Sequence, residues 1–179
     1  MNLTTIIIDD FLDKPDLVRA SALTLSFHNH GPYPGSRSDR ADYDYENYIK
    51  SKIESITPLK IKKFKQDSFR FQVCYETDNT WLHYDETGWA GILYLSPNAP
   101  VNAGTGLYRH KITQKMQGPG ELDVSIESDW EIVTSIGNVY NRLALYNGQL
   151  YHRSLLPGFG NTLETGRLTQ VFFFEADDK

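Results

Sequence analysis

The chain has 179 residues, 40% of them hydrophobic, which is enough to bury the core of one domain without disulfides or structural metals. Its formal net charge of −5 gives no sign of the basic surface that nucleic-acid-binding proteins carry, so we expect no nucleic-acid partner, and its apolar runs are too short to span a membrane. The only cysteine, Cys74, excludes an internal disulfide or a multi-thiolate metal site. We interpret it as a small buried side chain rather than a nucleophile, because no flanking residue supplies an activating cation. Residues 1–10 lack the pattern of a secretion signal, so we expect a cytoplasmic protein.

The N-terminal third predicts one strand and two helices. Their expected bounds are Leu3–Ile8 for the strand, about Pro15–Leu25 for the first helix and Asp44–Ile56 for the second. Proline suits the first turn of a helix and stops one elsewhere, so Pro15 marks a start and Pro58 an end. The segment His28–Arg40 is crowded with Gly, Pro and Ser and predicts a loop. The lysine-rich run Lys60–Lys65 is interpreted as a solvated strand or loop edge.

From Ser68 onward the sequence predicts mostly short strands separated by Gly, Pro and Asn turns. The expected strands are Phe69–Glu76, Gly91–Ser96, Gly106–Lys111, Val139–Tyr146, Gln149–His152 and Leu168–Glu175. A short helix around Trp130 is expected to interrupt them at Ile126–Ile136. We therefore predict one domain over residues 1–179, mainly β with flanking helices, in which residues 1–67 support a barrel or sandwich core at residues 68–176.

Asn147-Gly148 is the strongest short-range hairpin signal in the chain. A two-residue turn there would pair Leu145 with Leu150 and Leu143 with His152. Because leucines would then occupy the same face as His152, this histidine is predicted to point into the core. On its own, such a histidine is more often a hydrogen-bonded core residue than a metal ligand.

A second histidine lies in a short motif with a carboxylate. His83 and Asp85 are two positions apart, so in an extended segment both side chains project to one side. A single His-x-Asp is weak evidence, but together with His152 it completes two imidazoles and one carboxylate. That set forms the facial triad that binds iron(II) and leaves open positions for other ligands. The remaining histidines have no carboxylate at matching spacing and are interpreted as loop or strand residues; they are His28, His30 and His110.

Several motifs occur in the order typical of one superfamily: Phe71–Tyr75, His83–Asp85, Gly91–Ser96, Gly104–Leu107 and His152–Arg167. On these residues the sequence resembles the prolyl-hydroxylase-like 2-oxoglutarate/Fe(II)-dependent oxygenases, over roughly Ser68 to Phe174. Its Asn141–Leu143 and Arg167–Thr169 segments resemble an uncharacterised bacterial and phage branch of the superfamily, for which no substrate is known. The resemblance implies a double-stranded β-helix, or jelly-roll, cupin-like barrel that uses iron(II), 2-oxoglutarate and dioxygen. The expected reaction is hydroxylation of a small-molecule or peptidyl substrate, with release of succinate and carbon dioxide.

The same resemblance implies roles for residues beyond the triad. Arg167 takes the place of the basic residue that binds the far carboxylate of 2-oxoglutarate, with Thr169 and Tyr94 beside it. Strand alternation agrees, because Arg167 and Thr169 fall on the same face. Arg167 lies 15 positions after His152, which is more than the family commonly shows, so Leu155–Gly166 is expected to form an extra loop. Asp85 fills the ligand position that halogenating relatives leave for a halide.

Other interpretations stay open at this stage. Arg167 could be a strand-end arginine in a surface ion pair, and Tyr94 could be a packing residue. The protein could be a non-enzymatic cupin-like barrel that binds a metal or small molecule, or a zinc hydrolase that uses the same three ligands. Five residues could line the rim of the pocket or equally lie on the surface: Arg37, Arg40, Trp89, Arg109 and Asn141.

Overall fold

The computed structural model describes residues 3–29, 31–86, 88–120, 122–155 and 158–178. The two α-helices are α1 (Pro15–Ala22) and α2 (Tyr43–Ile56). The strands are β1 (Thr5–Ile8), β2 (Phe27–His28), β3 (Ser36–Arg40), β4 (Leu59–Phe64), β5 (Arg70–Cys74), β6 (Trp89–Tyr94), β7 (Thr105–His110), β8 (Trp130–Ile136), β9 (Leu143–Asn147), β10 (His152–Ser154) and β11 (Arg167–Asp178). Within these described ranges, neither helix is both long and apolar enough to cross a membrane.

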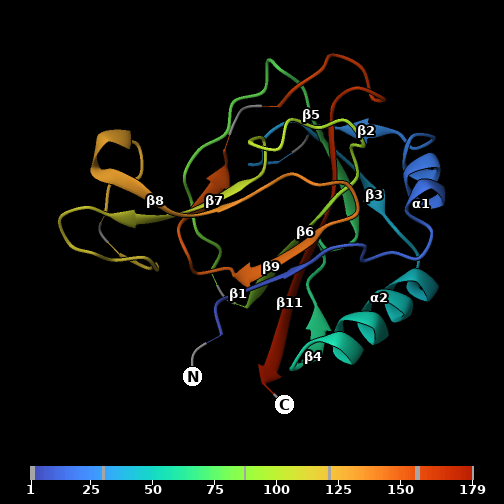
Figure 1. Ribbon diagram of the computed structural model, residues 1–179, viewed down its shortest axis with the longest axis horizontal. Helices are drawn as coiled ribbons and strands as arrows, with labels where there is room; N and C mark the ends of the chain where they lie inside the picture. Colours follow the sequence, from blue (N-terminus) through green and yellow to red (C-terminus); the bar gives the residue numbers. More distant parts are fainter. Residues whose placement is uncertain (1–2, 30, 87, 121, 156–157, 179) are drawn as a thin grey trace.

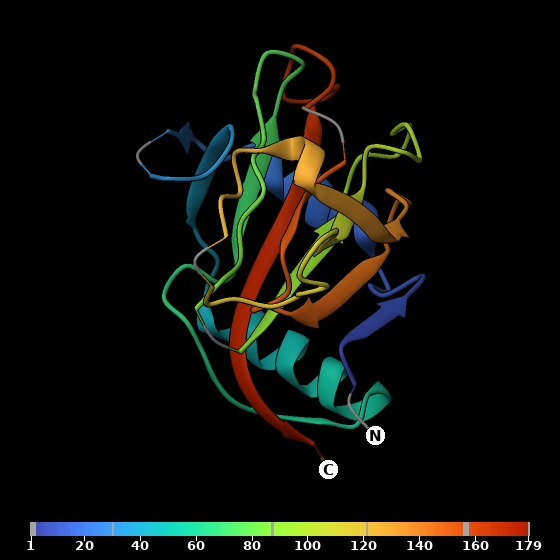
Figure 2. The same ribbon diagram turned by 90° about the vertical axis from the view of Figure 1, so that its left-hand side faces the viewer.

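The strands form two antiparallel sheets, and together they make a jelly-roll barrel. The large sheet has eight strands in the order β1-β9-β6-β11-β5-β3-β2, with β4 pairing to the far end of β11. The small sheet has the order β10-β7-β8. Both helices lie on the side of the large sheet that faces away from β7 and β8 (Figure 1), and the long strand β11 runs through the middle of the molecule (Figure 2). The predicted fold class is confirmed.

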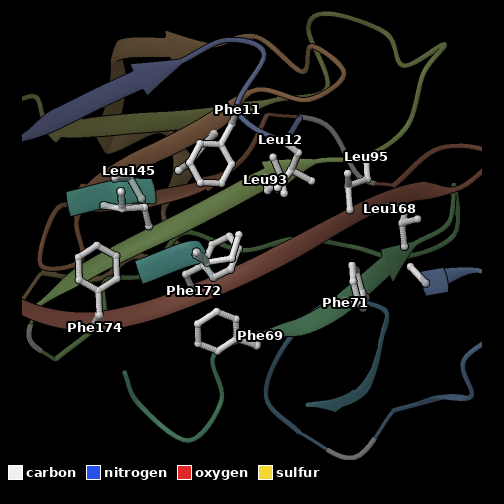
Figure 3. Packing of buried hydrophobic residues seen from close by; sticks show 14 of the residues in the cluster. Phe11, Leu12, Phe69, Phe71, Leu93, Leu95, Leu145, Leu168, Phe172 and Phe174 are labelled. Carbon is white, nitrogen blue, oxygen red and sulfur yellow. The ribbon is translucent and has the colours of Figure 1, made fainter. Parts of the chain in front are cut away.

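The two faces of the large sheet have different chemistry because side chains alternate along each strand. On β11, Leu168, Phe172 and Phe174 are completely buried against the helix-bearing side. Figure 3 shows them packed with side chains from β5, β6 and β9 and from the segment after β1. The opposite face, which carries Arg167 and Thr169, lines a cavity between the two sheets. The alternation predicted for this strand is therefore what separates the apolar core from the cavity.

Helix boundaries follow local signals in the sequence. Pro15 is the first residue of α1, as predicted. The side chain of Asp42 accepts a hydrogen bond of 2.9 Å from the backbone N–H of Tyr45 and so caps the start of α2, which ends two residues before Pro58. The lysine run forms β4, and its exposed Lys62 and Lys63 pair with acidic residues of β11, which agrees with a solvated strand edge.

Two element predictions were wrong. His28–Arg40 is not entirely a loop, because its ends form β2 and β3, and β3 extends the large sheet by pairing with β5. Ile126–Ile136 is not a helix: after a short 3₁₀ turn at Glu127–Asp129, residues from Trp130 form β8, which pairs with β7. In both cases the sheet supplies the backbone hydrogen bonds that the local sequence did not anticipate.

The predicted hairpin at Asn147-Gly148 was also wrong. Strand β9 pairs with β1 and β6, whereas β10 pairs with β7 in the other sheet. The chain therefore turns a corner from one sheet to the other, and Gly148 accommodates close contacts with Asp85 and the Gly88 carbonyl at this corner. The inward orientation predicted for His152 is nevertheless found, because this residue is 5% exposed. The correct orientation thus came from an incorrect register.

Candidate metal centre and its cavity

Three residues from two segments meet in the wall of the cavity. His83 lies in an extended segment that forms an isolated bridge with His152, the first residue of β10. The backbone N–H groups of the two histidines donate to each other's carbonyl oxygens at 3.1 and 2.8 Å. Asp85 is fixed two residues further on, where its backbone N–H donates to the Gly148 carbonyl at 2.7 Å. These backbone contacts bring the two parts of the triad together without any side-chain bond between them.

The ligand atoms of His83, Asp85 and His152 all lie within 4.8 Å of one another. Nε2 of His152 is 3.9 Å from Oδ2 of Asp85. Two ligands bound at about 2.1 Å can be at most about 4.2 Å apart, so this pair is within reach of one ion. Among the described residues no other group of three metal-ligating side chains converges in this way.

Each imidazole ring is oriented by a backbone carbonyl. Nδ1 of His83 lies 3.0 Å from the Trp81 carbonyl oxygen, and Nδ1 of His152 lies 2.7 Å from the Leu150 carbonyl oxygen. A carbonyl only accepts, so each Nδ1 is the protonated nitrogen and each Nε2 keeps a free lone pair. Oδ2 of Asp85 is buried and has no hydrogen-bond partner among the described residues. Two imidazole lone pairs and an unpartnered carboxylate oxygen are the donor set that a divalent metal would satisfy.

Burial also sets the charge state of the triad. Burial, followed by the proximity of His83, lowers the pKa of His152 to about 3, so its ring is neutral at physiological pH. Burial raises the pKa of Asp85, while His83, Lys65 and Arg37 act in the opposite direction. A neutral imidazole is the form that binds a metal, and the desolvated carboxylate would gain from a nearby cation.

Arg167 lies inside the protein and is 2% exposed. Its Nε donates to the Ala103 carbonyl at 3.1 Å, and Nη2 is 3.5 Å from the Gly104 carbonyl. No described carboxylate lies within ion-pairing distance of its guanidinium, so it is not the surface ion pair considered above. The guanidinium carbon is 5.7 Å from the ring centre of Tyr94, which is completely buried. Thr169, on the same face of β11, also lines the cavity.

The cavity has a volume of about 830 Å³ and contains both the triad and Arg167 along its walls. Sequence reasoning gave no role to several residues that line it. The Thr105 hydroxyl is hydrogen-bonded to that of Tyr94 at 2.7 Å, so it is Thr105 rather than Tyr94 that reaches the cavity wall. Tyr146 packs its ring 4.8 Å from that of His152. Thr105 lies in the motif Gly104–Leu107, and Tyr146 lies in the strand predicted before Asn147. Neither pattern indicated a role for these two residues in the site.

The five possible rim residues divide clearly. Arg37 lines the cavity, and the segment that contains it, His28–Arg40, contributes a large part of the wall. The other four are used elsewhere: Arg40 pairs with Glu46, Arg109 pairs with Glu131, Trp89 packs against the core, and Asn141 bonds the backbone of Leu12. Of the remaining histidines, His28 lines the cavity, His110 packs against Trp130, and His30 lies outside the described residues.

The extra loop predicted between His152 and Arg167 is present, although residues 156–157 lie outside the described range. The backbone N–H of Glu76 donates to the Gly160 carbonyl at 3.0 Å, and Nη2 of Arg19 donates to the Glu164 carbonyl at 2.7 Å. The loop is therefore attached to the end of β5 and to α1. The additional length does not alter the inward orientation of Arg167.

No protein-family model matches the sequence, and no curated protein matches it. Solved structures do match. HygX from Streptomyces hygroscopicus, with nickel, 2-oxoglutarate and hygromycin B bound, is 11% identical with a TM-score of 0.64, over 96% of this chain and 82% of HygX. A Pseudomonas putida prolyl-4-hydroxylase is 16% identical with a TM-score of 0.55, over 96% and 92%. The chain has the fold of the prolyl-hydroxylase-like 2-oxoglutarate oxygenases.

A third similar structure widens the range of molecules bound to proteins with this fold. It is a prolyl hydroxylase from Trichoplax adhaerens, in complex with a hypoxia inducible factor peptide fragment. It is 12% identical with a TM-score of 0.58, over 96% of this chain and 83% of that one. One of these similar structures thus holds a peptide and another holds hygromycin B. The shared fold therefore does not specify what the cavity of this protein binds.

Proposed function

We propose that this protein is an iron(II)- and 2-oxoglutarate-dependent dioxygenase that hydroxylates its substrate and releases succinate and carbon dioxide. The observation that carries the proposal is the convergence of His83, Asp85 and His152 in the wall of a cavity that the buried Arg167 also lines. A metal site and a buried arginine without a protein carboxylate together match the two ends of a small metal-chelating diacid.

The residues present fit both groups. His83, Asp85 and His152 would hold the metal through Nε2, a carboxylate oxygen and Nε2, and the other positions around it would remain open. Arg167 would bind the far carboxylate of 2-oxoglutarate, with Thr169 beside it and Tyr94 packed under the guanidinium. When bound, the metal and 2-oxoglutarate supply the oxidising chemistry.

The protein's own contribution is binding and orientation. The carbonyls of Trp81 and Leu150 orient the two imidazole rings, so each ring keeps its Nε2 lone pair for a metal. The ring of Tyr146 packs against His152, and Ala90 and Ile92 add apolar surface to the same cavity, which would favour the exclusion of water once a substrate fills it. The substrate would lie in the remaining cavity, whose other wall is formed by the His28–Arg40 segment.

Two rival functions are less well supported. A zinc hydrolase with the same ligands would give no reason for an arginine buried without a carboxylate partner. A non-enzymatic cupin-like barrel could hold a metal and a small acid, but it would not turn over the acid. A measurement of catalytic turnover therefore distinguishes the dioxygenase from the binding barrel. The identity of the bound metal distinguishes the dioxygenase from the zinc hydrolase.

The test is succinate formation. The purified protein is supplied with iron(II), 2-oxoglutarate and oxygen, and succinate is measured for the wild type and for Asp85→Ala. Wild-type turnover that the variant lacks supports the proposal, and a search for products 16 Da heavier in a treated lysate would then identify the substrate. Absence of succinate from wild-type protein that binds both iron and 2-oxoglutarate, with and without lysate, would favour the binding barrel. Zinc as the metal retained after anaerobic purification would favour the hydrolase.

A further inference from the structure

A second arginine in the cavity has no assigned role. Arg37 is on β3, directly opposite Gln72 on β5, which is in turn opposite Thr169 on β11. Directly opposite residues of antiparallel strands project from the same face, so Arg37 shares the cavity face with Thr169. Two strand spacings and two residues separate Arg37 from Arg167, which places their Cα atoms roughly 12 Å apart in a flat sheet. Both ends of a five-carbon diacid are already assigned, to the metal and to Arg167, so this diacid does not account for Arg37.

The Arg37 guanidinium is held in place by its neighbours. Nε donates to Oε1 of Gln72 at 2.9 Å, and the amide nitrogen of Gln72 donates to the Pro34 carbonyl at 2.7 Å. The guanidinium carbon lies 4.1 Å from the ring centre of Tyr33 and 5.8 Å from that of Phe173. Within the described part of the chain, no acceptor is hydrogen-bonded to the terminal nitrogens. The group is thus oriented, and its two-pronged end is available to a ligand.

The carboxylates that share the cavity do not neutralise Arg37. Burial lowers the pKa of this guanidinium, while Tyr33 and Asp67 act in the opposite direction. Asp39, Asp67 and Glu86 also line the cavity but are exposed, and no described carboxylate lies within 4.0 Å of the Arg37 guanidinium. Asp85 belongs to the triad. A half-buried cation without a partner is costly unless a bound anion compensates it.

The balance of charges in the cavity also favours a bound anion at Arg37. This step rests on the proposed function, because it counts iron(II) and 2-oxoglutarate as bound. The two positive charges of iron(II) and the one of Arg167 are matched by Asp85 and the two carboxylates of 2-oxoglutarate. None of these three negative charges is then left for Arg37, and the other acidic residues of the lining, Asp39, Asp67 and Glu86, are exposed. We propose that Arg37 binds an anionic group of the substrate, a carboxylate or a phosphate, and so orients the substrate against the metal. The rings of Tyr33, Trp81 and Phe173 line the same cavity, so an apolar or aromatic body next to the anion is accommodated.

The experiment uses simple probes on unreactive protein. Wild-type protein is loaded with Ni²⁺ and saturating 2-oxoglutarate, which fills the triad and Arg167, and is then titrated with benzoate, phenyl phosphate and the neutral benzamide. Binding is followed by calorimetry and by the NMR signal of the Arg37 Nε–H. We expect one or both anions to bind at least tenfold more tightly than benzamide, about 1.4 kcal/mol, and to shift this signal. The relative affinity of benzoate and phenyl phosphate tells which anion the site prefers.

Matched variants locate the anion. In Arg37→Gln the preference for anions over benzamide should disappear, whereas Arg37→Lys should keep part of it. Arg109→Gln, which removes an arginine that is paired with Glu131 outside the cavity, should leave it intact. Arg153→Gln removes the arginine that lines the cavity and is paired with Glu127 at 2.5 Å, and its effect should be small.

Several outcomes would overturn the proposal. The first is anion binding that persists in Arg37→Gln, and the second is anion binding that is lost in Arg153→Gln. The third is anion binding that disappears as the concentration of 2-oxoglutarate is raised, and the fourth is a wild type that shows no preference for anions over benzamide. If Arg37→Gln does not fold, the Nε–H signal of the wild type and Arg37→Lys still decide the result. Failure of the proposed function looks different, because Ni²⁺-dependent binding of 2-oxoglutarate would then be absent before any probe is added.

Discussion

Replacing Arg167 by alanine is the most direct test of the proposed co-substrate site. The side chain is 2% exposed, and its hydrogen-bond partners among the described residues are two carbonyl oxygens at 3.1 and 3.5 Å, the second at the limit of a hydrogen bond. Its terminal nitrogens are therefore available to a ligand carboxylate. Charge-assisted hydrogen bonds contribute roughly 1.5–3 kcal/mol each, so the lower end for a bidentate contact is about 3 kcal/mol. This corresponds to roughly a hundredfold loss of 2-oxoglutarate affinity, and we take tenfold as the smallest loss compatible with the assignment.

The assay is calorimetry under anaerobic conditions, with 2-oxoglutarate titrated into Ni²⁺-loaded protein. Ni²⁺ affinity, measured separately, should stay near that of the wild type, because Arg167 is not one of the three triad residues. Arg167→Lys should resemble the alanine variant more than the wild type, since an ammonium group cannot reproduce the two-pronged contact. Arg109→Ala, at an arginine paired with Glu131 on β8, is the matched control. Unchanged 2-oxoglutarate affinity in Arg167→Ala would refute the reasoning.

Three further predictions concern the triad and the core. Asp85→Asn should abolish the stabilisation that Ni²⁺ gives the protein in thermal unfolding. The metal-free variant should be more stable than the metal-free wild type by about 1 kcal/mol, because the change removes a desolvated and unpartnered charge. A metal-free variant that is less stable than the wild type would contradict this. Burial lowers the pKa of His152 in the folded, metal-free protein, so as the pH falls this histidine is protonated in the unfolded chain before it is protonated in the folded one. The free energy of unfolding should therefore fall by up to about 1.4 kcal/mol per pH unit as the pH drops below about 6.5. Denaturant unfolding at a series of pH values measures this slope, and His152→Asn should reduce it. Phe172→Ala should lower the free energy of unfolding by about 3–5 kcal/mol, because Phe172 is completely buried in the core. Phe173→Ala should lower it clearly less, because Phe173 lies on the cavity face. Equal losses would show that the two faces of β11 do not differ as described.

The sequence by itself determined the features that depend on neighbours along the chain. Alternation on β11 placed Arg167 and Thr169 on one face and the apolar residues Leu168 and Phe172 on the other. The spacing of His83 and Asp85 put both on one side of an extended segment. Pro15 marked the start of α1. Each of these follows from a period or a backbone restriction that acts within a few residues, so no knowledge of the fold was needed.

Only the tertiary structure decided how distant segments pair. Asn147-Gly148 has the local chemistry of a hairpin, yet the residues that follow join the small sheet, because β7 offers His152 and its neighbours a ladder of hydrogen bonds. The Gly- and Pro-rich segment before Arg40 ends as β3 for a similar reason, since β5 presents an unpaired edge to it. That pairing also places Arg37 in the wall of the cavity. From the sequence alone, Arg37 could equally have been a surface residue. Strand partners are chosen by contacts between residues far apart in the chain, and the local sequence carries no signal for them.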